Sequence, residues 1–201
     1  MKLQLGQTDI FFPVPAALIV GSFENKVDVA TIAWVGMVSS TPPTIGISFD
    51  KSRYSLSLIR QSGYFTVNIP SADYYKETDY CGIVSGRNTD KASVAGFSYY
   101  HGTRTKTPII KECPFNLECK VTKEIELGSY IMLLGEIVET YIDEDKTIVQ
   151  NGRAKIDIEK VNPLVYCATV REYWKLDKKV GTAFNAGKDI VQNELGERNG
   201  Q

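Results

Sequence analysis

Apolar and polar residues alternate along much of this chain. The segments TIGISF (44–49) and FNLECKV (115–121) carry an apolar residue at every second position. A period of two is typical of a β-strand that buries one face. Similar or more continuous apolar runs predict further strands at 16–23, 27–35, 64–69, 130–142 and 164–168.

The links between these strands favour an antiparallel arrangement. Glu24-Asn25-Lys26 is a short polar link that predicts a hairpin between the first two strands. Parallel neighbours would need a crossover of about a dozen residues or more, and most of the links are shorter than that. The pattern therefore predicts a barrel-like antiparallel sheet.

Helices are predicted only at the rims of this sheet. One runs over 53–61, with Ser52 as its cap and Gly63 at its end. Two more are predicted at 72–83 and 182–195, the last as an amphipathic stretch. No linker divides the sequence, so we expect a single domain over 1–201 that ends in a helical C-terminal tail over 177–201.

Composition narrows the range of functions. The chain of 201 residues is 43% hydrophobic and 23% charged, as in ordinary globular proteins, and its formal net charge is −1. This balance predicts no nucleic-acid or membrane partner. No apolar run approaches the about 20 residues that span a bilayer, and the first residues lack the apolar core of a signal peptide, so we expect a cytoplasmic location. The four cysteines form no Cys-x-x-Cys pair, and no metal site is predicted.

Two hydroxyl-rich turns beside apolar strands are the first candidate functional segments. SSTPP (39–43) separates the strands, and DKSRYS (50–55) follows the second one. Taken alone, SSTPP is a turn. In the second segment, Lys51 and Arg53 lie with two serines at a predicted helix N-terminus, where free N–H groups and the helix dipole favour an anion. The alternative is a capping serine surrounded by solvated charges.

A third segment, taken together with these two turns, completes a pattern of motifs. CGIVSGRNTDKASVAGF (81–97) places a Ser-Gly-Arg turn before a lysine that opens another short helical stretch. Together the segments resemble the flavin reductase-like family, and within it the flavoredoxin branch. The resemblance is carried, in family order, by ATIAW (30–34), SSTPP (39–43), RYS (53–55), SGR (85–87), DK (90–91), GSY (128–130), GE (135–136) and PLVY (163–166).

The resemblance implies a fold and a set of contacts. The fold would be mainly β (α+β), an antiparallel Greek-key split β-barrel with peripheral helices that binds FMN. It implies that the flavin ring and ribityl chain lie along Thr31, Ile32, Ala33, Trp34, Val38 and Ser39. It implies that the phosphate is held by Arg53, Tyr54 and Ser55. The remaining cofactor contacts that it implies come from Ser85, Gly86, Lys91 and Tyr166.

Cofactor and assembly follow from the same resemblance. FMN is expected rather than FAD, because the sequence offers one phosphate-sized cluster and no evident site for a second phosphate or an adenine. A homodimer is expected, with the flavin at or beside the subunit interface. Open sheet edges and the apolar C-terminal residues Tyr173 and Trp174 give independent support, since both need to be covered. The alternative is that the C-terminal segment folds back over its own barrel.

The sequence leaves several possibilities for the electron donor. Many relatives have a histidine where this chain has Tyr130, a position associated with the nicotinamide side of the flavin, so Tyr130 is the candidate catalytic residue. A tyrosine can donate a hydrogen bond but brings no positive charge at neutral pH. The sequence therefore fits an FMN-dependent oxidoreductase supplied by NAD(P)H or a redox protein, or a non-catalytic flavin carrier. A barrel for another anionic ligand, such as haem or pyridoxine phosphate, is a remoter alternative.

Overall fold

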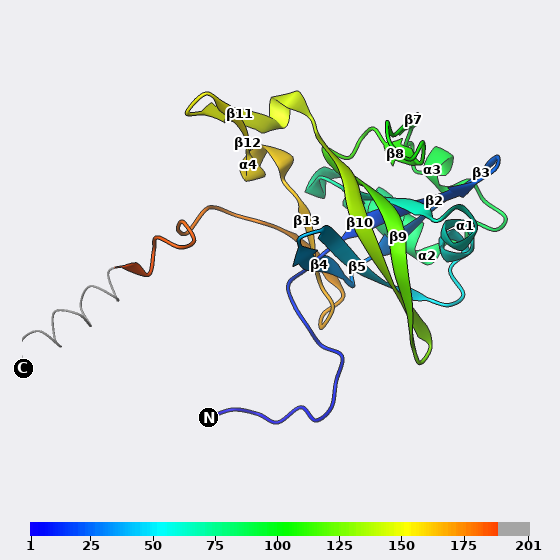
Figure 1. The fold of residues 1–201 in the computed structure, drawn as a ribbon. Helices are drawn as coiled ribbons and strands as arrows, with labels where there is room; N and C mark the ends of the chain where they lie inside the picture. Colours follow the sequence, from blue (N-terminus) through cyan, green and yellow to red (C-terminus); the bar gives the residue numbers. More distant parts are fainter. Residues whose placement is uncertain (189–201) are drawn as a thin grey trace, which may run out of the picture.

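The computed structural model describes residues 1–188. Its main body is a curved antiparallel sheet in the order β3-β2-β6-β9-β10-β5-β4 (Figure 1). The strands of this sheet are β2 (Ala17–Phe23), β3 (Lys26–Ile32), β4 (Val35–Ser40), β5 (Pro43–Asp50), β6 (Tyr64–Ile69), β9 (Phe115–Leu127) and β10 (Tyr130–Ile142). Strands β5 and β6 are consecutive in sequence, yet the β9–β10 hairpin lies between them, as in a Greek key.

Shorter elements surround the sheet. A separate three-stranded sheet joins β1 (Val14–Pro15), β13 (Leu164–Cys167) and β14 (Glu172–Lys175). Two small hairpins pair β7 (Tyr99–His101) with β8 (Pro108–Ile110) and β11 (Thr147–Gln150) with β12 (Arg153–Ile156). The helices are α1 (Tyr54–Ser62), α2 (Tyr75–Ile83), α3 (Lys91–Val94) and α4 (Ile158–Val161), with 3-10 turns η1 (Ala72–Tyr74) and η2 (Glu144–Lys146). This is the mainly β split barrel with peripheral helices that the sequence predicts.

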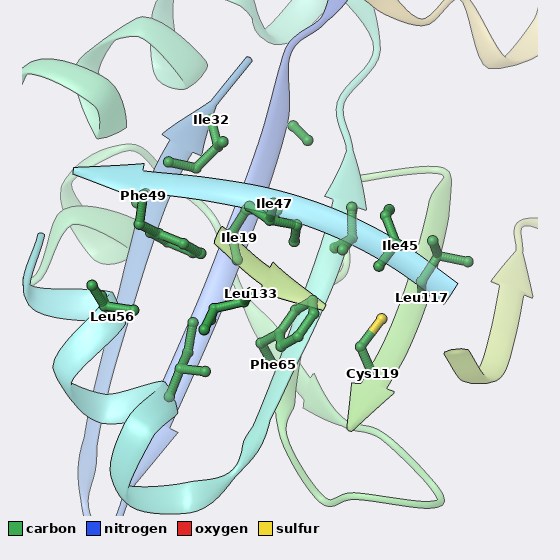
Figure 2. Close-up of a cluster of buried hydrophobic side chains, with 14 of the residues drawn as sticks. Ile19, Ile32, Ile45, Ile47, Phe49, Leu56, Phe65, Leu117, Cys119 and Leu133 are labelled. Atoms are coloured by element: carbon green, nitrogen blue, oxygen red, sulfur yellow. The ribbon is translucent and has the colours of Figure 1, made fainter. Parts of the chain in front are cut away.

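Strand β2 is buried on both faces, and this divides the apolar interior into two clusters. Ile19 points into the barrel with Ile47, Phe49 and Phe65 (Figure 2). Its neighbour Leu18 points outward, into the layer under α2 and α3. A continuous apolar run is expected for a strand that is covered on both sides. The barrel wall is therefore fixed against the helices that border the candidate site.

Helix α1 packs directly on β2. A Cβ atom added at Gly21 would lie 2.7 Å from the carbonyl oxygen of Ser55, which leaves no room for any side chain. The helix ends at Gly63, whose φ of 77° is the left-handed conformation that glycine adopts at low cost. The close approach at Gly21 sets the position of the N-terminal end of α1.

Most predicted strands are confirmed, but the one expected over 27–35 is two strands. Strand β3 ends at Ile32, and β4 begins at Val35. Between them the Val35 N–H group donates to the Ala33 carbonyl at 3.1 Å, while the Trp34 carbonyl accepts from the Ser48 N–H group at 2.9 Å. The contact with Ser48 bends the chain, so β3 and β4 lie at opposite ends of the sheet order.

The helix predictions need correction at the cap of α1, at 72–83 and in the tail. Ser52 does not cap α1, because its hydroxyl and N–H groups both donate to Asp50 Oδ1, and Arg53 takes the N-cap position instead. The helix predicted over 72–83 is η1 followed by α2. The tail predicted over 177–201 and its helix predicted over 182–195 lie partly outside the described residues, and the described part has turns over 183–187 instead of a continuous helix. After β14 this part of the chain leads away from the barrel (Figure 1).

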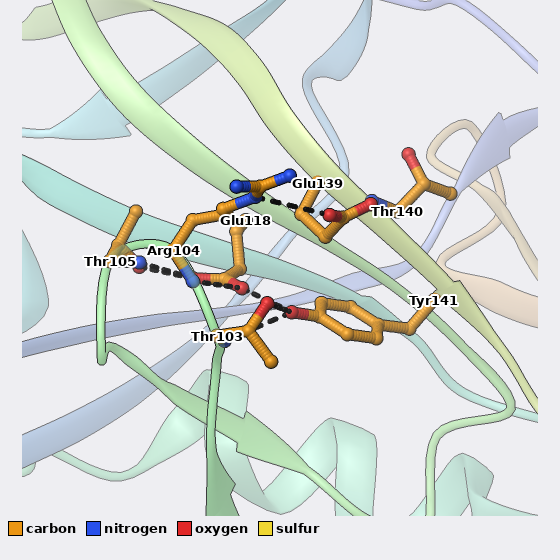
Figure 3. A network of polar contacts seen from close by, with 7 residues as sticks. All are labelled: Thr103, Arg104, Thr105, Glu118, Glu139, Thr140 and Tyr141. Atoms are coloured by element: carbon orange, nitrogen blue, oxygen red, sulfur yellow. Dashed lines mark hydrogen bonds and ion pairs between the residues drawn. The ribbon is translucent and has the colours of Figure 1, made fainter.

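A buried carboxylate anchors the loop that follows β7. Glu118 on β9 is inaccessible to solvent and accepts hydrogen bonds from the Arg104 N–H group at 3.2 Å, the Thr105 N–H group at 2.7 Å and the Tyr141 hydroxyl (Figure 3). A Cβ atom at Gly102 would lie 2.2 Å from the Glu118 carboxyl carbon, so the loop wraps tightly around the carboxylate. Burial raises the pKa of Glu118, but the hydrogen bonds from Thr105 and Tyr141 outweigh it, and the pKa is lowered overall.

Glu118→Gln tests this anchor through the pH dependence of stability. A carboxyl whose pKa is depressed by folding stabilises the protein above its unfolded-state pKa, and this contribution is lost as the pH falls through the folded-state value. The variant should lose about 1–3 kcal/mol at pH 7, and less at acidic pH. Urea unfolding between pH 7 and pH 3 measures both, because the contribution is lost below the usual carboxyl pKa of about 4.5. The exposed Glu24→Gln change is the control, and an equal loss at both pH values would contradict the prediction.

Candidate functional site

Two adjoining hollows lie at the N-terminal end of α1. The larger, the aromatic hollow, has a volume of about 430 Å³, and the smaller, the helix hollow, has about 350 Å³. The aromatic hollow is lined by Asp9, Ile10, Thr31, Ile32, Ala33, Trp34, Ser48, Asp50, Arg53, Tyr130, Tyr166, Ala168 and Arg171. The helix hollow is lined by Asp28, Asp50, Ser52, Arg53, Tyr54, Ile83, Val84, Ser85, Gly86, Lys91 and Tyr130. Both share Asp50, Arg53 and Tyr130, so one elongated molecule can occupy them together.

The end of α1 is suited to an anion. Arg53 occupies the N-cap position but makes no side-chain cap, and the first turn holds no acidic residue. Free backbone N–H groups and the helix dipole therefore face this end without compensation. The hydroxyl of Ser55 is fully buried and has no hydrogen-bond partner among the described residues. Arg53 itself donates from Nη1 to the Gly82 carbonyl at 2.7 Å, which holds its side chain between α1 and α2.

Two charged residues close to Arg53 in the sequence, Asp50 and Lys51, lie in different places relative to the hollows. Asp50 lines both hollows and is held by Ser52, whose side-chain and backbone hydrogen bonds keep the pKa of this carboxyl below its usual value. Lys51 forms an ion pair with Glu126 at the end of β9 and lines neither hollow. The two basic residues of the DKSRYS segment are thus separated, and only Arg53 reaches the site.

A buried ion pair supports the wall of the helix hollow. Lys91 Nζ lies 3.0 Å from Asp28 Oδ1, and both side chains are 2% exposed. Lys91 also donates to the Cys81 carbonyl at 3.3 Å. The turn at Gly86 passes so close that a Cβ atom there would lie 1.9 Å from Asp28 Oδ1. The ammonium of Lys91 is therefore already paired with a carboxylate at the wall of the hollow.

The Cys81 thiol, close to this wall, is not a reactive group. Burial raises the pKa of the Cys81 thiol to about 12, so the thiol stays protonated at neutral pH and is a poor nucleophile. All four cysteines are free. Among residues 1–188, no group of three or more His, Cys, Asp or Glu residues could hold a metal ion, and no helix is long and apolar enough to cross a membrane.

Aromatic side chains form the other hollow. The rings of Trp34 and Tyr130 have centroids 4.8 Å apart and are tilted by 46°. Tyr166, on the opposite β13–β14 hairpin, lies 5.4 Å from the ring of Tyr173, whose hydroxyl donates to Asp79 on α2 at 3.0 Å. The hollow thus lies between the barrel and a hairpin that is fastened to α2. Its walls suit a flat ring.

Most residues that the sequence assigns to the site do lie together. The aromatic hollow includes Thr31, Ile32, Ala33, Trp34, Arg53, Tyr130 and Tyr166. The helix hollow includes Arg53, Tyr54, Ser85, Gly86, Lys91 and Tyr130. Three of the predicted residues line neither hollow: Val38, Ser39 and Ser55. Val38, on the exposed strand β4, packs over Gly46 of the neighbouring strand β5. The Ser39 hydroxyl accepts a hydrogen bond from the Thr41 N–H group at 3.2 Å.

Sequence reasoning missed four charged residues of the site: Asp9, Asp28, Asp50 and Arg171. Asp50 is the first residue of the DKSRYS segment, and its place at the end of a strand could have identified it. Asp28 lies between Val27 and Val29 in a predicted strand, and a carboxylate flanked by valines could have indicated the buried charge that the structure shows. Arg171 lies in a short turn near the C-terminus, and nothing in the local sequence distinguishes it.

Comparison with known proteins connects this geometry to a family. The model of the flavin reductase-like domain matches residues 10–175, which include the lining of both hollows apart from Asp9. The chain belongs to the flavin reductase-like family. Membership supports a redox function that involves a flavin.

Solved structures place the chain within the flavoredoxin branch of the family. Flavoredoxin of Desulfovibrio vulgaris is 32% identical, with a TM-score of 0.86 over 93% of this chain and 100% of that chain. Flavoredoxin from Methanosarcina acetivorans is 33% identical, with a TM-score of 0.85 over 94% of this chain and 99% of that chain. A similar uncharacterized protein of Archaeoglobus fulgidus is 35% identical over 65% of this chain and 73% of its own length.

Gly86→Ala tests the close packing around the buried ion pair of this family member. The added methyl group would meet the Asp28 carboxylate, so the Ser85-Gly86 turn would have to move away from β3. We expect a loss of about 1–3 kcal/mol in the free energy of unfolding, as for overpacked interiors. Gly36→Ala on β4 is the matched control, because nothing lies within 4 Å of a Cβ atom there. Equal unfolding midpoints for the two variants would contradict this packing.

Proposed function

We propose that this protein is an FMN-dependent oxidoreductase of the flavoredoxin type, which passes electrons from a reduced nicotinamide or a redox protein to a small acceptor or to free flavin. One observation carries the proposal. The uncapped end of α1, with Arg53 beside it, opens into a hollow with aromatic walls. A molecule with a phosphate at one end and a flat ring at the other matches this arrangement. The relatives named flavoredoxin support the same conclusion.

The helix hollow fits the phosphate of FMN. The N–H groups at the start of α1 and the Arg53 guanidinium would bind it, since a charged donor at a helix N-terminus gives short, strong hydrogen bonds to phosphate. The buried Ser55 hydroxyl, which has no hydrogen-bond partner within residues 1–188, lies in the first turn of the same helix. Lys91 would act at a distance, because Asp28 already engages its ammonium.

The aromatic hollow fits the ring system. FMN would supply the capacity to take up and release electrons. The chain would orient it: the backbone from Thr31 to Trp34 lies along one edge of the hollow, and the rings of Trp34 and Tyr130 would shield one side from water. The Thr31 side chain is not available, because its hydroxyl donates to the Thr78 carbonyl at 2.5 Å. FAD is less suitable, since the N-terminal end of α1 with Arg53 accounts for one phosphate.

A second function, that of a flavin carrier without its own nicotinamide site, is favoured by the contact between Trp34 and Tyr130. Their rings lie 4.8 Å apart and leave no gap between them for a third ring. The neutral Tyr130 side chain also cannot form an ion pair with a phosphate of a nicotinamide cofactor. Mixing the FMN-loaded protein with NADH or NADPH in a stopped-flow instrument separates the two functions. Rapid bleaching of the flavin indicates the enzyme, and bleaching only by a reduced redox protein or dithionite indicates the carrier. We also propose that the protein is located in the cytoplasm.

Arg53→Ala tests the phosphate position. Loss of one charge-assisted hydrogen bond to phosphate costs about 1.5–3 kcal/mol, or roughly a tenfold to hundredfold loss of FMN affinity. Lys51→Ala should change the affinity little, because Lys51 is paired with Glu126 outside both hollows. Titration of the flavin-free protein with FMN, followed by flavin fluorescence, measures both variants. Equal effects would place the phosphate elsewhere.

We also propose a homodimer in which β4 takes part. This strand is at one end of the main sheet, so its outer edge has no strand neighbour among the described residues. Met37 and Val38 on it are 59% and 54% exposed. An open apolar edge of this kind favours association with a second chain. Trp34, just before β4, also lines the aromatic hollow, so a partner at this edge would lie beside the flavin.

Met37→Glu tests the interface. A charge at the centre of a dimer contact should weaken association, and light scattering at tens of micromolar should show a larger monomer fraction than for the wild type. Val149→Glu is the matched control, because Val149 is 80% exposed on the β11–β12 hairpin, away from β4. A wild-type protein that stays monomeric with FMN bound would contradict the dimer. A truncation after Leu176 shows whether the tail contributes.

A further inference from the structure

Arg171 lines the aromatic hollow in an unusual backbone conformation. It lies in the tight turn between β13 and β14, with a φ of 56°. The turn is closed by a hydrogen bond from the Val170 N–H group to the Cys167 carbonyl at 3.2 Å. A long side chain rarely adopts a positive φ, and glycine or asparagine would do so at lower cost. Glu24 and Lys106 also have a positive φ, so Arg171 is distinguished by its place in the lining of the aromatic hollow.

The hairpin that carries Arg171 is well supported. Strand β13 pairs with β1 on one side and with β14 on the other. Tyr173 on β14 donates to Asp79, and Tyr166 packs against Tyr173. These contacts tie the hairpin both to the N-terminal strand and to α2. The base of the Arg171 side chain is therefore held in place relative to the barrel side of the hollow.

The guanidinium of Arg171 has no carboxylate partner in the described part of the chain. None of the ion pairs within 4.0 Å includes it. Two carboxylates, those of Asp9 and Asp50, line the same hollow. Asp50 is occupied by Ser52, and Asp9 lies on the N-terminal segment ahead of β1. Arg171 is thus a free cation beside aromatic walls, on the opposite hairpin from the phosphate-binding end.

We infer that the aromatic hollow takes, beside the flavin ring, a planar substrate that carries a carboxylate, and that Arg171 binds this carboxylate while the substrate ring lies along Tyr166 on the hairpin side. The inference rests on the proposed function, because it places this substrate next to FMN. Arginine suits the role, since its planar fork matches a carboxylate in two hydrogen bonds. Aromatic walls favour a flat ring over an aliphatic acid. Asp9 would oppose the substrate charge and so limit the affinity.

The probe for this site is benzoate, with benzyl alcohol as its uncharged counterpart. Each is titrated into the FMN-loaded protein, and binding is followed by the change in the flavin absorption spectrum and by calorimetry. Wild-type protein should prefer benzoate by about fivefold, the value of one exposed ion pair. Arg171→Asn suits the positive φ but removes the charge, and it should abolish the preference. Arg171→Lys should keep part of it, and Asp9→Asn should increase benzoate affinity.

Arg153→Asn, on the exposed β11–β12 hairpin, is the matched control and should behave as the wild type. The inference is overturned if wild-type protein binds the two probes equally, if Arg171→Asn keeps the preference, or if Arg171→Asn weakens FMN binding as strongly as benzoate binding. The last result would make Arg171 a flavin ligand. Protein that takes up no FMN at all contradicts the proposed function as well, whereas normal FMN binding without a benzoate preference contradicts this inference alone.

Discussion

The buried ion pair between Asp28 and Lys91 is the constraint on which the candidate site depends. Two charges inside a protein are tolerated only when they satisfy each other, and loss of either partner leaves the other without compensation. The pair joins β3 to α3, Lys91 reaches the carbonyl of Cys81 on α2, and the turn at Gly86 lies directly on the Asp28 carboxylate. One wall of the helix hollow is built in this way. The opposite wall is α1, which is held against β2 at Gly21.

These two supports explain how the protein retains unfavourable local features. The N-terminal end of α1 has no side-chain cap, the Ser55 hydroxyl is buried without a partner, and Arg171 has a positive φ. Each lowers the stability of the isolated fold, and all three occur at or next to the same pair of hollows. Such features accumulate at sites whose ligand compensates for them. A bound phosphate would satisfy the helix end, and a bound carboxylate would pair with Arg171.

The sequence predicts the barrel well because alternation with a period of two is a local signal. Strand β10 has the bounds that the pattern predicts, and the hairpin at Glu24 is confirmed. Features set by distant contacts could not be predicted. The break at Trp34 depends on Ser48, Lys91 is neutralised by Asp28 on another strand, and Ser52 bonds to Asp50 instead of capping α1. For the site, the motifs that carry the family resemblance predicted about half of the lining residues, whereas Arg171 became visible only when the β13–β14 hairpin was placed against the barrel.

The central claim is that one molecule of FMN spans both hollows, with its phosphate at the start of α1 and its ring between the barrel and the β13–β14 hairpin. A crystal structure of the protein with bound FMN tests this most directly. The account predicts that phosphate oxygens lie within hydrogen-bond distance of Arg53 and of the first free N–H groups of α1, with the ring beside Trp34 and Tyr130. Electron density that places the phosphate next to Lys51 and Glu126, or the ring outside the aromatic hollow, would contradict it.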